Sequence, residues 1–366
     1  MLLTDILDEV PDPRDCNARH DLTDVLFVAL AAVLCGATHY TEMAFFAETR
    51  LELLRRFVPL KHGAPSHDTF TRVLGALDPA GFNTAFAKFM ATFGEQARLD
   101  TGGQLAIDGK SLRRAYDKGL AHMPPLVVTV FSCDTFMSLS QQVAAKGGEA
   151  QAAILALDLL SLKGCTVTAD ALHCHRRMTK TIRDRGGHYV LTLKGNQSSL
   201  LKQAQAALDK GEANPRVVKL ETVHEAHGRQ EVRRAFVVPF AQTPGPKALI
   251  DLAAVARVER WRTVDGKTTH KVRQYVLSKR MPPDQVLRIV RRHWSIENDL
   301  HWQLDVLMDE DQNRTRKNQG PANQAVLRRL ALNVLRSDPA TIPLRHKQLK
   351  ASWNPEDLLS LMTHMR

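Results

Sequence analysis

The sequence predicts an α/β protein in which a sheet domain follows an all-helical N-terminal part and is interrupted by a β-rich insertion. Residues 1–98 show helical periodicity and helix caps. From residue 104, short apolar runs alternate with helical stretches, a pattern typical of a sheet layered with helices. Between residues 198 and 283 the runs become longer and alternate with turn residues, which favours strands.

We expect residues 1–98 to form a helical domain that binds DNA. Asp21 can cap "LTDVLFVALAAVLCGA", which Gly36 ends, and Thr41 can cap "EMAFFAETRLELLRRF". Asp78 can cap a further helix that has Pro79 at its first position. In between, "APSHDTFTRVLGAL" predicts a short helix after a Pro-containing turn. This is the layout of a helix-turn-helix module, and a plain structural bundle fits it equally well.

The remaining elements define four further segments. The first part of the sheet domain, residues 99–197, contains the apolar runs "QLAID", "LVVTVFS", "SLSQQVAA", "CTVTAD" and "HYVLTLK" and helices at 149–162 and 174–185. The insertion, residues 198–283, contains "VVKLETVHEA", "RQEVRRAFVV", "LAAVARVERWR" and "HKVRQYVLS". Helical periodicity returns over residues 284–340, and a polar, Pro-containing tail follows at 341–366.

The composition indicates a globular protein with an anionic partner. Of the 366 residues, 44% are hydrophobic, which excludes disorder as the default state. The formal net charge of +11 indicates a polyanion, nucleic acid first and an anionic membrane second, although it could merely keep the protein soluble. Five cysteines without a CxxC pair favour a reducing compartment. The longest apolar run, residues 25–37, is too short to span a membrane, so we expect a cytoplasmic protein.

Two aspartates follow apolar strands. "QLAIDGKS" places Asp108 at the end of one predicted strand, and "CTVTADAL" places Asp170 at the end of another. The C-terminal ends of strands are where α/β sheets open to their ligands, so both carboxylates are candidate site residues. An N-cap or a turn is the other role open to each of them.

A third acid lies in the unusual stretch "RRHWSIENDLHWQLDVLMDED". If residues 284–308 form one helix, its apolar stripe consists of Ile296, Leu300, Leu304 and Leu307. Glu297 lies at the edge of this stripe, whereas Asp299 and Asp305 point away from it. A carboxylate buried there would need a metal or a partner such as Arg292 or Arg314.

Two strand-end aspartates and a helical glutamate suit Mg²⁺ or Mn²⁺, because hard cations prefer oxygen ligands. A pair of such ions supports phosphoryl transfer on nucleic acid. The cluster of His173, Cys174 and His175 could suggest zinc, but adjacent residues face different ways and do not easily share one ion.

The chain closely resembles the bacterial insertion-sequence DDE transposases of the H-repeat-associated group. The resemblance runs over nearly the whole sequence and is carried by "DPRD", "PSHDTFTRVL", "LAIDGKSLR", "TVTADALH", "YVLTLKGNQ", "HGRQEVRR" and "RRHWSIENDLHWQLDVLMDEDQNR". It implies an RNase H-like catalytic domain in which Asp108 of "IDGK", Asp170 of "TADA" and Glu297 of "WSIEN" bind two divalent metals. Related groups carry a Tyr-Arg-Glu-Lys signature around the third acid, which this chain lacks.

Several residues near these acids are candidate DNA contacts. Six belong to the segments that follow Asp108 and the "HYVLTLK" strand: Lys110, Arg113, Arg114, Lys194, Asn196 and Gln197. His301, one turn beyond Glu297, is expected to orient it or to contact phosphate, and Arg314 is a further candidate. Trp294 and Trp302 are expected to be packing anchors.

The sequence therefore predicts a transposase that uses Mg²⁺, with Mn²⁺ as a substitute, to cleave the ends of its element and join them to target DNA. Its expected partners are double-stranded DNA, as terminal inverted repeats and as target, and further copies of the chain in a dimer or larger assembly. The expected location is the bacterial nucleoid. Two other hypotheses remain: a transposase-derived DNA-binding protein without cleavage activity, and a metal-dependent nuclease without strand transfer.

Overall fold

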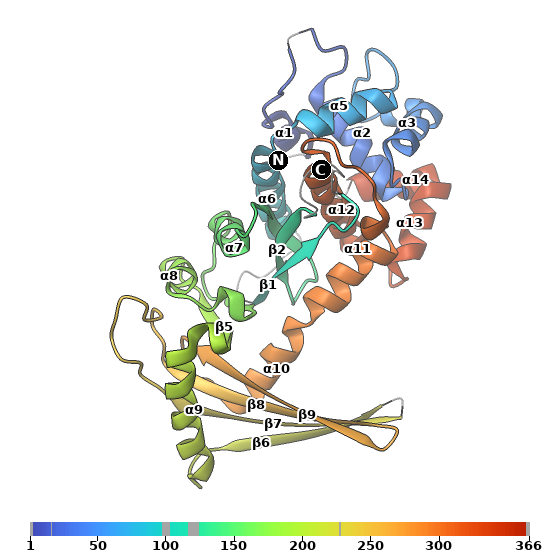
Figure 1. Ribbon diagram of the computed structural model, residues 1–366. Coiled ribbons are helices and arrows are strands. Elements are labelled where there is room, and N and C mark those ends of the chain that lie inside the picture. The colour runs from blue at the N-terminus through green and yellow to red at the C-terminus, as the bar shows by residue number, and fades with distance from the viewer. Residues whose placement is uncertain (1–2, 16, 97–102, 116–123, 227, 364–366) are drawn as a thin grey trace. The chain divides into compact units, whose positions relative to one another are not determined.

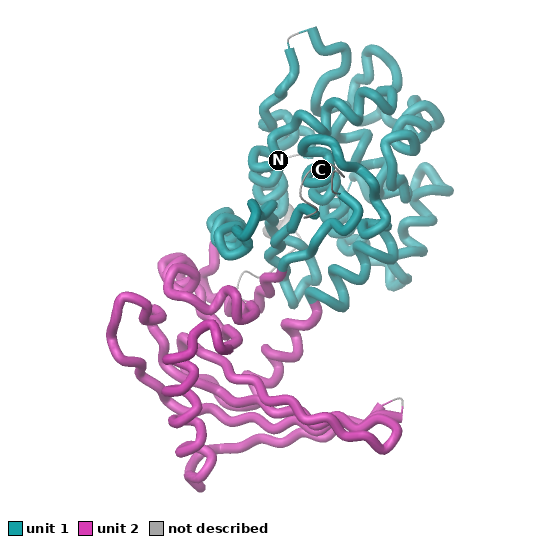
Figure 2. The backbone as a smooth tube through the Cα atoms, viewed as in Figure 1, with its two compact units in different colours: residues 1–100, 109–160, 296–366 teal, residues 101–108, 161–295 magenta. Residues whose placement is uncertain are grey.

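The computed structural model describes residues 3–15, 17–96, 103–115, 124–226 and 228–363. These residues form two compact units, each assembled from separate segments of the chain (Figure 2). The first unit comprises residues 1–100, 109–160 and 296–366, and the second comprises residues 101–108 and 161–295.

The helices of the first unit surround two almost fully buried helices. Its N-terminal helices are α1 (Leu3–Asp8), α2 (Leu22–Leu34), α3 (Tyr40–Thr49), α4 (Leu51–Leu54), α5 (His67–Ala76) and α6 (Pro79–Gln96) (Figure 1). Helix α2 is buried along nearly its whole length and packs against α12 (Gly320–Ser337), which is buried from Gly320 to Leu335. Three of the helices predicted in this region are confirmed as α2, α5 and α6, and Asp78 caps α6 by accepting hydrogen bonds from the backbone of Ala80 and Gly81. The single helix predicted from Glu42 to Phe57 is divided at Arg50 into α3 and α4.

The predicted start of the second helix is wrong. Thr41 lies inside α3, which begins at Tyr40 after the N-cap residue His39. The Glu42 carboxylate accepts hydrogen bonds from the backbone N–H groups of Thr38 and His39, at 2.6 and 3.2 Å. A glutamate at the third helical position thus satisfies donors that the helix itself leaves unpaired.

The residues expected to form a polar tail contain two helices, α13 (Leu344–Trp353) and α14 (Pro355–Thr363). Helix α13 packs against the N-terminal helices: the Cys35 thiol donates to the Ala351 carbonyl at 3.4 Å, and Arg50 donates to that of Ser352 at 3.0 Å. In α14, Leu358, Leu359, Leu361 and Met362 are buried. Helix α13 buries Lys347, Gln348 and Ala351, so its contacts with the rest of the chain are mainly polar.

The first unit also contains two antiparallel strands, β2 (Leu126–Ser132) and β3 (Ser138–Ala144). Helix α7 (Glu149–Asp158) packs on both strands, and α6 packs on β3. A small cluster of Leu112, Ala115, Val127 and Ala325 joins this strand pair to α12. Strands β2 and β3 and helix α7 lie within residues 99–197, the predicted first part of the sheet domain, and α6 directly precedes it.

The second unit is built on a mixed sheet. The first half of β1 (Gln104–Ser111) pairs in parallel with β4 (Thr166–Ala169), which pairs in parallel with β5 (His188–Leu193). The sheet continues through antiparallel strands β9 (Lys267–Leu277), β8 (Ala254–Val264), β7 (Arg229–Pro239) and β6 (Lys219–Ala226). The prediction of a mixed α/β protein with long strands in the insertion is confirmed.

Three helices accompany this sheet: α8 (Arg176–Asp184), α9 (Ser198–Ala213) and α10 (Pro283–His293). Helix α9 occupies the first residues of the segment expected to be β-rich, so the strands begin only at Lys219. Helix α9 packs on one face of strands β6 to β9. Helix α10 packs on the other face through Val286, Leu287 and Ile289. None of the helices in the described part of the chain is both long and apolar enough to cross a bilayer.

Candidate active site

Two of the three candidate acids occupy matching positions beside neighbouring strands of the second unit. The parallel register of β1 and β4 ends with the pair Ile107 and Ala169. Asp108 is the next residue of β1, and Asp170 directly follows β4. Adjacent strands lie about 4.8 Å apart, so the sheet places these two residues side by side. The fold thus brings together two acids that are 62 residues apart in the sequence.

Asp170 combines an exposed position with a defined local role. Its Oδ1 accepts a hydrogen bond at 2.8 Å from the backbone N–H of Leu172 and so caps the short 3₁₀ helix Ala171–His173. The N-cap role, one of the two roles that the sequence allowed for Asp170, is therefore confirmed. A carboxylate has about four lone-pair sites, so this bond leaves capacity for a metal ion.

The strand that carries Asp108 is longer than predicted. It continues through Gly109 and Lys110 to Ser111 instead of ending at Asp108. Beyond Asp108, an ideal Cβ on Gly109 would lie 2.9 Å from Oε1 of Glu149, so the strand passes that carboxylate closely because residue 109 has no side chain. The expectation of a strand end at Asp108 is therefore wrong.

Asn196 and Gln197 hold the turn that follows Asp170. The side-chain amide of Asn196 donates to the Ala171 carbonyl at 2.6 Å, and that of Gln197 donates to the Cys174 carbonyl at 3.0 Å. Both amides were predicted to contact DNA, and the structure gives each a donor role inside the protein. Lys194, the third residue of that group, is exposed at the end of β5.

Glu297 lies in the first unit, in the π-helical turn Ile296–His301 that precedes α11 (Trp302–Val306). The predicted apolar stripe is confirmed, because Ile296, Leu300 and Leu304 are fully buried. Glu297 itself is exposed. The regular helix expected over residues 284–308 is interrupted here, and the wider π turn changes the direction of the residues that follow.

Lys110 and the acids after Glu297 form an internal ion-pair network within the first unit. The Lys110 Nζ lies 2.7 Å from Asp305 Oδ1 and 3.0 Å from Asp311 Oδ1, and its side chain is 8% exposed. Burial raises the pKa of Asp305, and the hydrogen bond from Lys110 opposes that rise. Lys110 is therefore a buried ion-pair partner and not the exposed DNA contact that was predicted.

His301 is uncharged at neutral pH. Burial, followed by the charges of Arg329 and Lys110, lowers the pKa of His301 to about 3. A neutral imidazole adds no cationic attraction for a phosphate, so the expected phosphate contact loses its electrostatic basis.

The remaining basic candidates lie at the surface of the first unit. The Arg113 side chain is 76% exposed, although its guanidinium lies 3.2 Å from Asp311. Arg114 is exposed, and its backbone carbonyl accepts a hydrogen bond from Arg316 at 3.1 Å. Arg314 is also exposed. These three guanidinium groups can reach a ligand in solution.

The tryptophans and the histidine cluster have mainly local roles. The guanidinium of Arg273 lies 4.7 Å from the ring centre of Trp294, which is a packing contact as predicted. Trp302 is 54% exposed, so the expectation that it is a packing anchor is wrong.

The histidine cluster has a local role. His175 caps α8 by accepting a hydrogen bond from the backbone N–H of Met178. Within the described ranges, no three His, Cys, Asp or Glu side chains form a group that could hold a metal.

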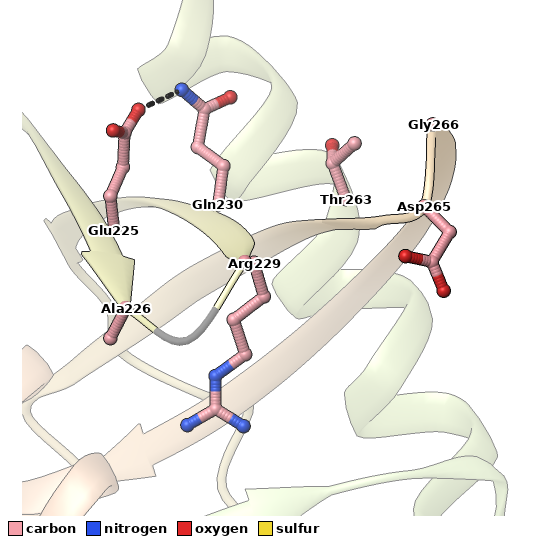
Figure 3. Close-up of a pocket in the computed structure, with 8 residues that line it drawn as sticks. Glu225, Ala226, Arg229, Gln230, Thr263, Asp265 and Gly266 are labelled. Carbon is pink, nitrogen blue, oxygen red and sulfur yellow. Dashed lines mark hydrogen bonds between the residues drawn. The ribbon is translucent and has the colours of Figure 1, made fainter.

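A separate pocket of about 470 Å³ lies between the hairpin turns of the second unit (Figure 3). It is lined by Glu225, Arg229, Gln230, Thr263 and Asp265 among others, and Gln230 donates to Glu225 at 2.6 Å. None of the candidate acids lines it. Because its lining has both signs of charge and lies between solvent-exposed turns, the pocket does not resemble a catalytic site.

The mixed sheet and the two aspartates at matching strand positions define an α/β protein with a candidate acidic site. A family model described as "Transposase DDE domain" matches residues 99–334, and a "DDE_Tnp_1-associated" model matches residues 4–90. The chain therefore belongs to the transposase DDE domain family.

Curated relatives agree with this assignment. The chain is similar to the "H repeat-associated putative transposase YhhI" of Escherichia coli K12, with 30% identity over 96% of this chain and 95% of the relative. It is also similar to the "Putative transposase YncI" of Escherichia coli O157:H7, with 31% identity over 91% of this chain and 87% of the relative. A solved structure of a piggyBac transposase synaptic complex with hairpin DNA matches at a TM-score of 0.43 and 13% identity, covering 99% of this chain and 78% of that one.

Proposed function

We propose that the protein is a DNA transposase that hydrolyses DNA at the ends of its own mobile element and joins the freed 3′-hydroxyl to target DNA. The observation that carries this proposal is the placement of Asp108 and Asp170 at adjacent positions on parallel strands of a DDE-family chain. Glu297 is the third member of the proposed site, and its exposed position leaves its carboxylate accessible.

In this proposal, residues 99–197 and 284–340 build an RNase H-like catalytic domain around the insertion at 198–283. The parallel strands β1, β4 and β5 support this assignment, because they form a parallel core from which the acids extend. The helices of residues 1–98 would bind DNA, and α5, whose N-cap is Ser66, is the candidate recognition element. Residues 341–366 would support this helical region.

The three acids are donors of the chemical type that divalent metal ions prefer. Asp108, Asp170 and Glu297 would hold two Mg²⁺ ions, or Mn²⁺ in their place, because carboxylate oxygens are the preferred ligands of hard cations. Such ions, when bound, favour deprotonation of the attacking hydroxyl and stabilise negative charge on the leaving oxygen. The chain itself contributes orientation: the bond from Leu172 to Asp170 fixes that side chain, and the amides of Asn196 and Gln197 hold the turn beneath it.

The basic excess of the chain supports a DNA partner. A net charge of +11 provides the cations that replace condensed counterions on the phosphate backbone. Arg113, Arg114, Lys194 and Arg314 are exposed and would contact the strand near the acids. Joining two element ends requires at least two active sites, so the working form would be a dimer or larger assembly on the bacterial nucleoid.

The test is incubation of the full chain with duplex DNA carrying the sequence that flanks its gene, in Mg²⁺ or Mn²⁺. We expect both cleaved ends and DNA joined to an unrelated target plasmid. Cleavage without joined product would instead identify a nuclease. Tight binding without cleavage in either metal would identify a transposase-derived DNA-binding protein.

A further inference from the structure

The four strands β6 to β9 separate their charges between the two faces of the sheet. Neighbouring residues on a strand point to opposite faces, so the register assigns each side chain to one face. The face on which α10 packs carries seven basic residues and one acid, Glu231. The basic residues are Arg229, Arg233, Arg260, Arg262, Lys267, Lys271 and Arg273, which we call the basic face.

The opposite face is balanced. It carries three basic residues and three acids: Lys219, Arg234, Arg257, Glu221, Glu225 and Glu259. Helix α9 covers part of it, and its Asp209 and Glu212 pair with Arg257, while Glu212 also pairs with Arg234. The positive excess of this sheet therefore belongs to one face only.

The basic face includes a row of like charges. Arg233 lies directly opposite Arg260, and Arg260 lies directly opposite Lys271. Like charges at directly opposed positions destabilise a sheet. Glu231 offsets part of this cost by pairing with Arg233 and lying 3.8 Å from Arg260. A row that costs stability indicates that the charges have a use outside the fold.

Two residues of the row are accessible, and α10 adds a further charge beside it. The Arg260 side chain is 34% exposed, and Lys271 is exposed. Arg291, an exposed residue near the end of α10, lies close enough for its charge to help lower the pKa of Arg233, after the larger effect of burial. Figure 1 shows the four strands continuing beyond α10 toward their hairpin turns, so α10 does not cover the distal part of this face.

We propose that the basic face binds the phosphate backbone of duplex DNA without reading its sequence. This proposal rests on the proposed function and deepens it: the insertion would hold a segment of target DNA, whose sequence varies, while other parts of the chain recognise the element ends. Cationic side chains spaced about 6.8 Å apart along a strand and about 4.8 Å between strands suit a polyanion surface. Neither α10 nor α9 obstructs the distal rows.

The test compares two full-length triple variants that each remove three positive charges. Arg260→Gln, Arg262→Gln and Lys271→Gln alter the basic face, whereas Lys202→Gln, Lys210→Gln and Lys219→Gln alter α9 and the opposite face. The measurement is fluorescence anisotropy with a 30-bp random duplex in EDTA, over a series of salt concentrations. Because no divalent metal is present, the result does not depend on cleavage.

We expect the basic-face variant to bind more weakly, with a slope of log affinity against log salt that is smaller by about 1 for each phosphate that it no longer neutralises. The weakening should be the same for unrelated sequences, and the melting temperature should stay equal or rise because like-charge repulsion is relieved. The control variant should keep most of the wild-type affinity and slope.

Equal binding by wild type and the basic-face variant would overturn the proposal, and so would an equal weakening in the control. Tighter binding to phosphatidylserine vesicles than to the duplex, abolished in the same variant, would assign the surface to membranes instead. A wild type that cleaves and joins DNA while its basic-face variant binds normally would leave the transposase proposal standing. If the wild type never cleaves DNA but the basic-face variant loses DNA binding, the result would support the basic face as a DNA-binding surface and refute the proposed function.

Discussion

Replacing Asp170 with Asn should abolish cleavage and joining while leaving DNA binding intact. Asn is as good an N-cap as Asp, so its side-chain oxygen can still accept from the Leu172 backbone and keep the turn folded. It is a neutral and much weaker metal ligand than a carboxylate. Since changes in the outer partners of metal ligands already cost about 10- to 100-fold, we expect a loss of more than about 100-fold in the single-turnover cleavage rate.

The matched control for this variant is Asp184→Asn. Asp184 is an exposed acid at the end of α8 in the same unit, and it pairs with Lys180 across one helical turn. Removing its charge should leave cleavage and DNA binding within about twofold of wild type, as for most surface substitutions. Cleavage by Asp170→Asn at a rate close to that of the control would exclude Asp170 from the site.

Replacing Glu310 with Ala should destabilise the first unit by about 3–5 kcal/mol, the usual cost of breaking a buried ion pair. Glu310 and Arg329 are both fully buried, and Oε1 of Glu310 lies 2.9 Å from Nη1 of Arg329. Arg329 also donates to Thr129 at 3.1 Å, so the pair ties the segment after α11 to α12 and β2. Without Glu310, a guanidinium inside α12 loses its counter-charge in a place that water does not reach.

Chemical denaturation measures this loss, and two further variants interpret it. Glu356→Ala removes an exposed acid 3.8 Å from Arg56 and should change the free energy of unfolding by less than about 1 kcal/mol. Combining Arg329→Met with Glu310→Leu should recover much of the missing stability, because an apolar pair leaves no unpaired charge. An unfolding midpoint of Glu310→Ala equal to that of wild type would show that the ion pair does not stabilise the fold.

The sequence predicted the elements whose signals are local. Helix α2 is a long apolar run, and α6 begins at Asp78 and Pro79, so neighbouring residues define both. The apolar runs that became β1, β4 and β5 also contain their own signal, and Asp170 and Lys194 follow β4 and β5 as predicted. Asp108 and Asp170 could be paired because their runs are adjacent parallel strands in the same register, although β1 continues beyond Asp108.

Long-range contacts decide the features that the sequence could not predict. Lys110 looked like a DNA contact because nothing near it in sequence shows that Asp305 and Asp311 fold against it. The π turn that contains Glu297 breaks the 100° periodicity on which the helix prediction relied. Helices α13 and α14 were missed because they are stabilised by contacts with residues elsewhere in the chain, such as Arg50, which the local sequence does not show.

We propose above all that Asp108, Asp170 and Glu297 together bind the metal ions of the reaction. The most direct measurement is the anomalous scattering of Mn²⁺ in crystals of the full chain bound to DNA. We predict two peaks about 3.5–4 Å apart that contact all three carboxylates, and their loss in Asp108→Asn. Mn²⁺ bound elsewhere, or bound by the aspartates with Glu297 remote from both ions, would contradict the claim.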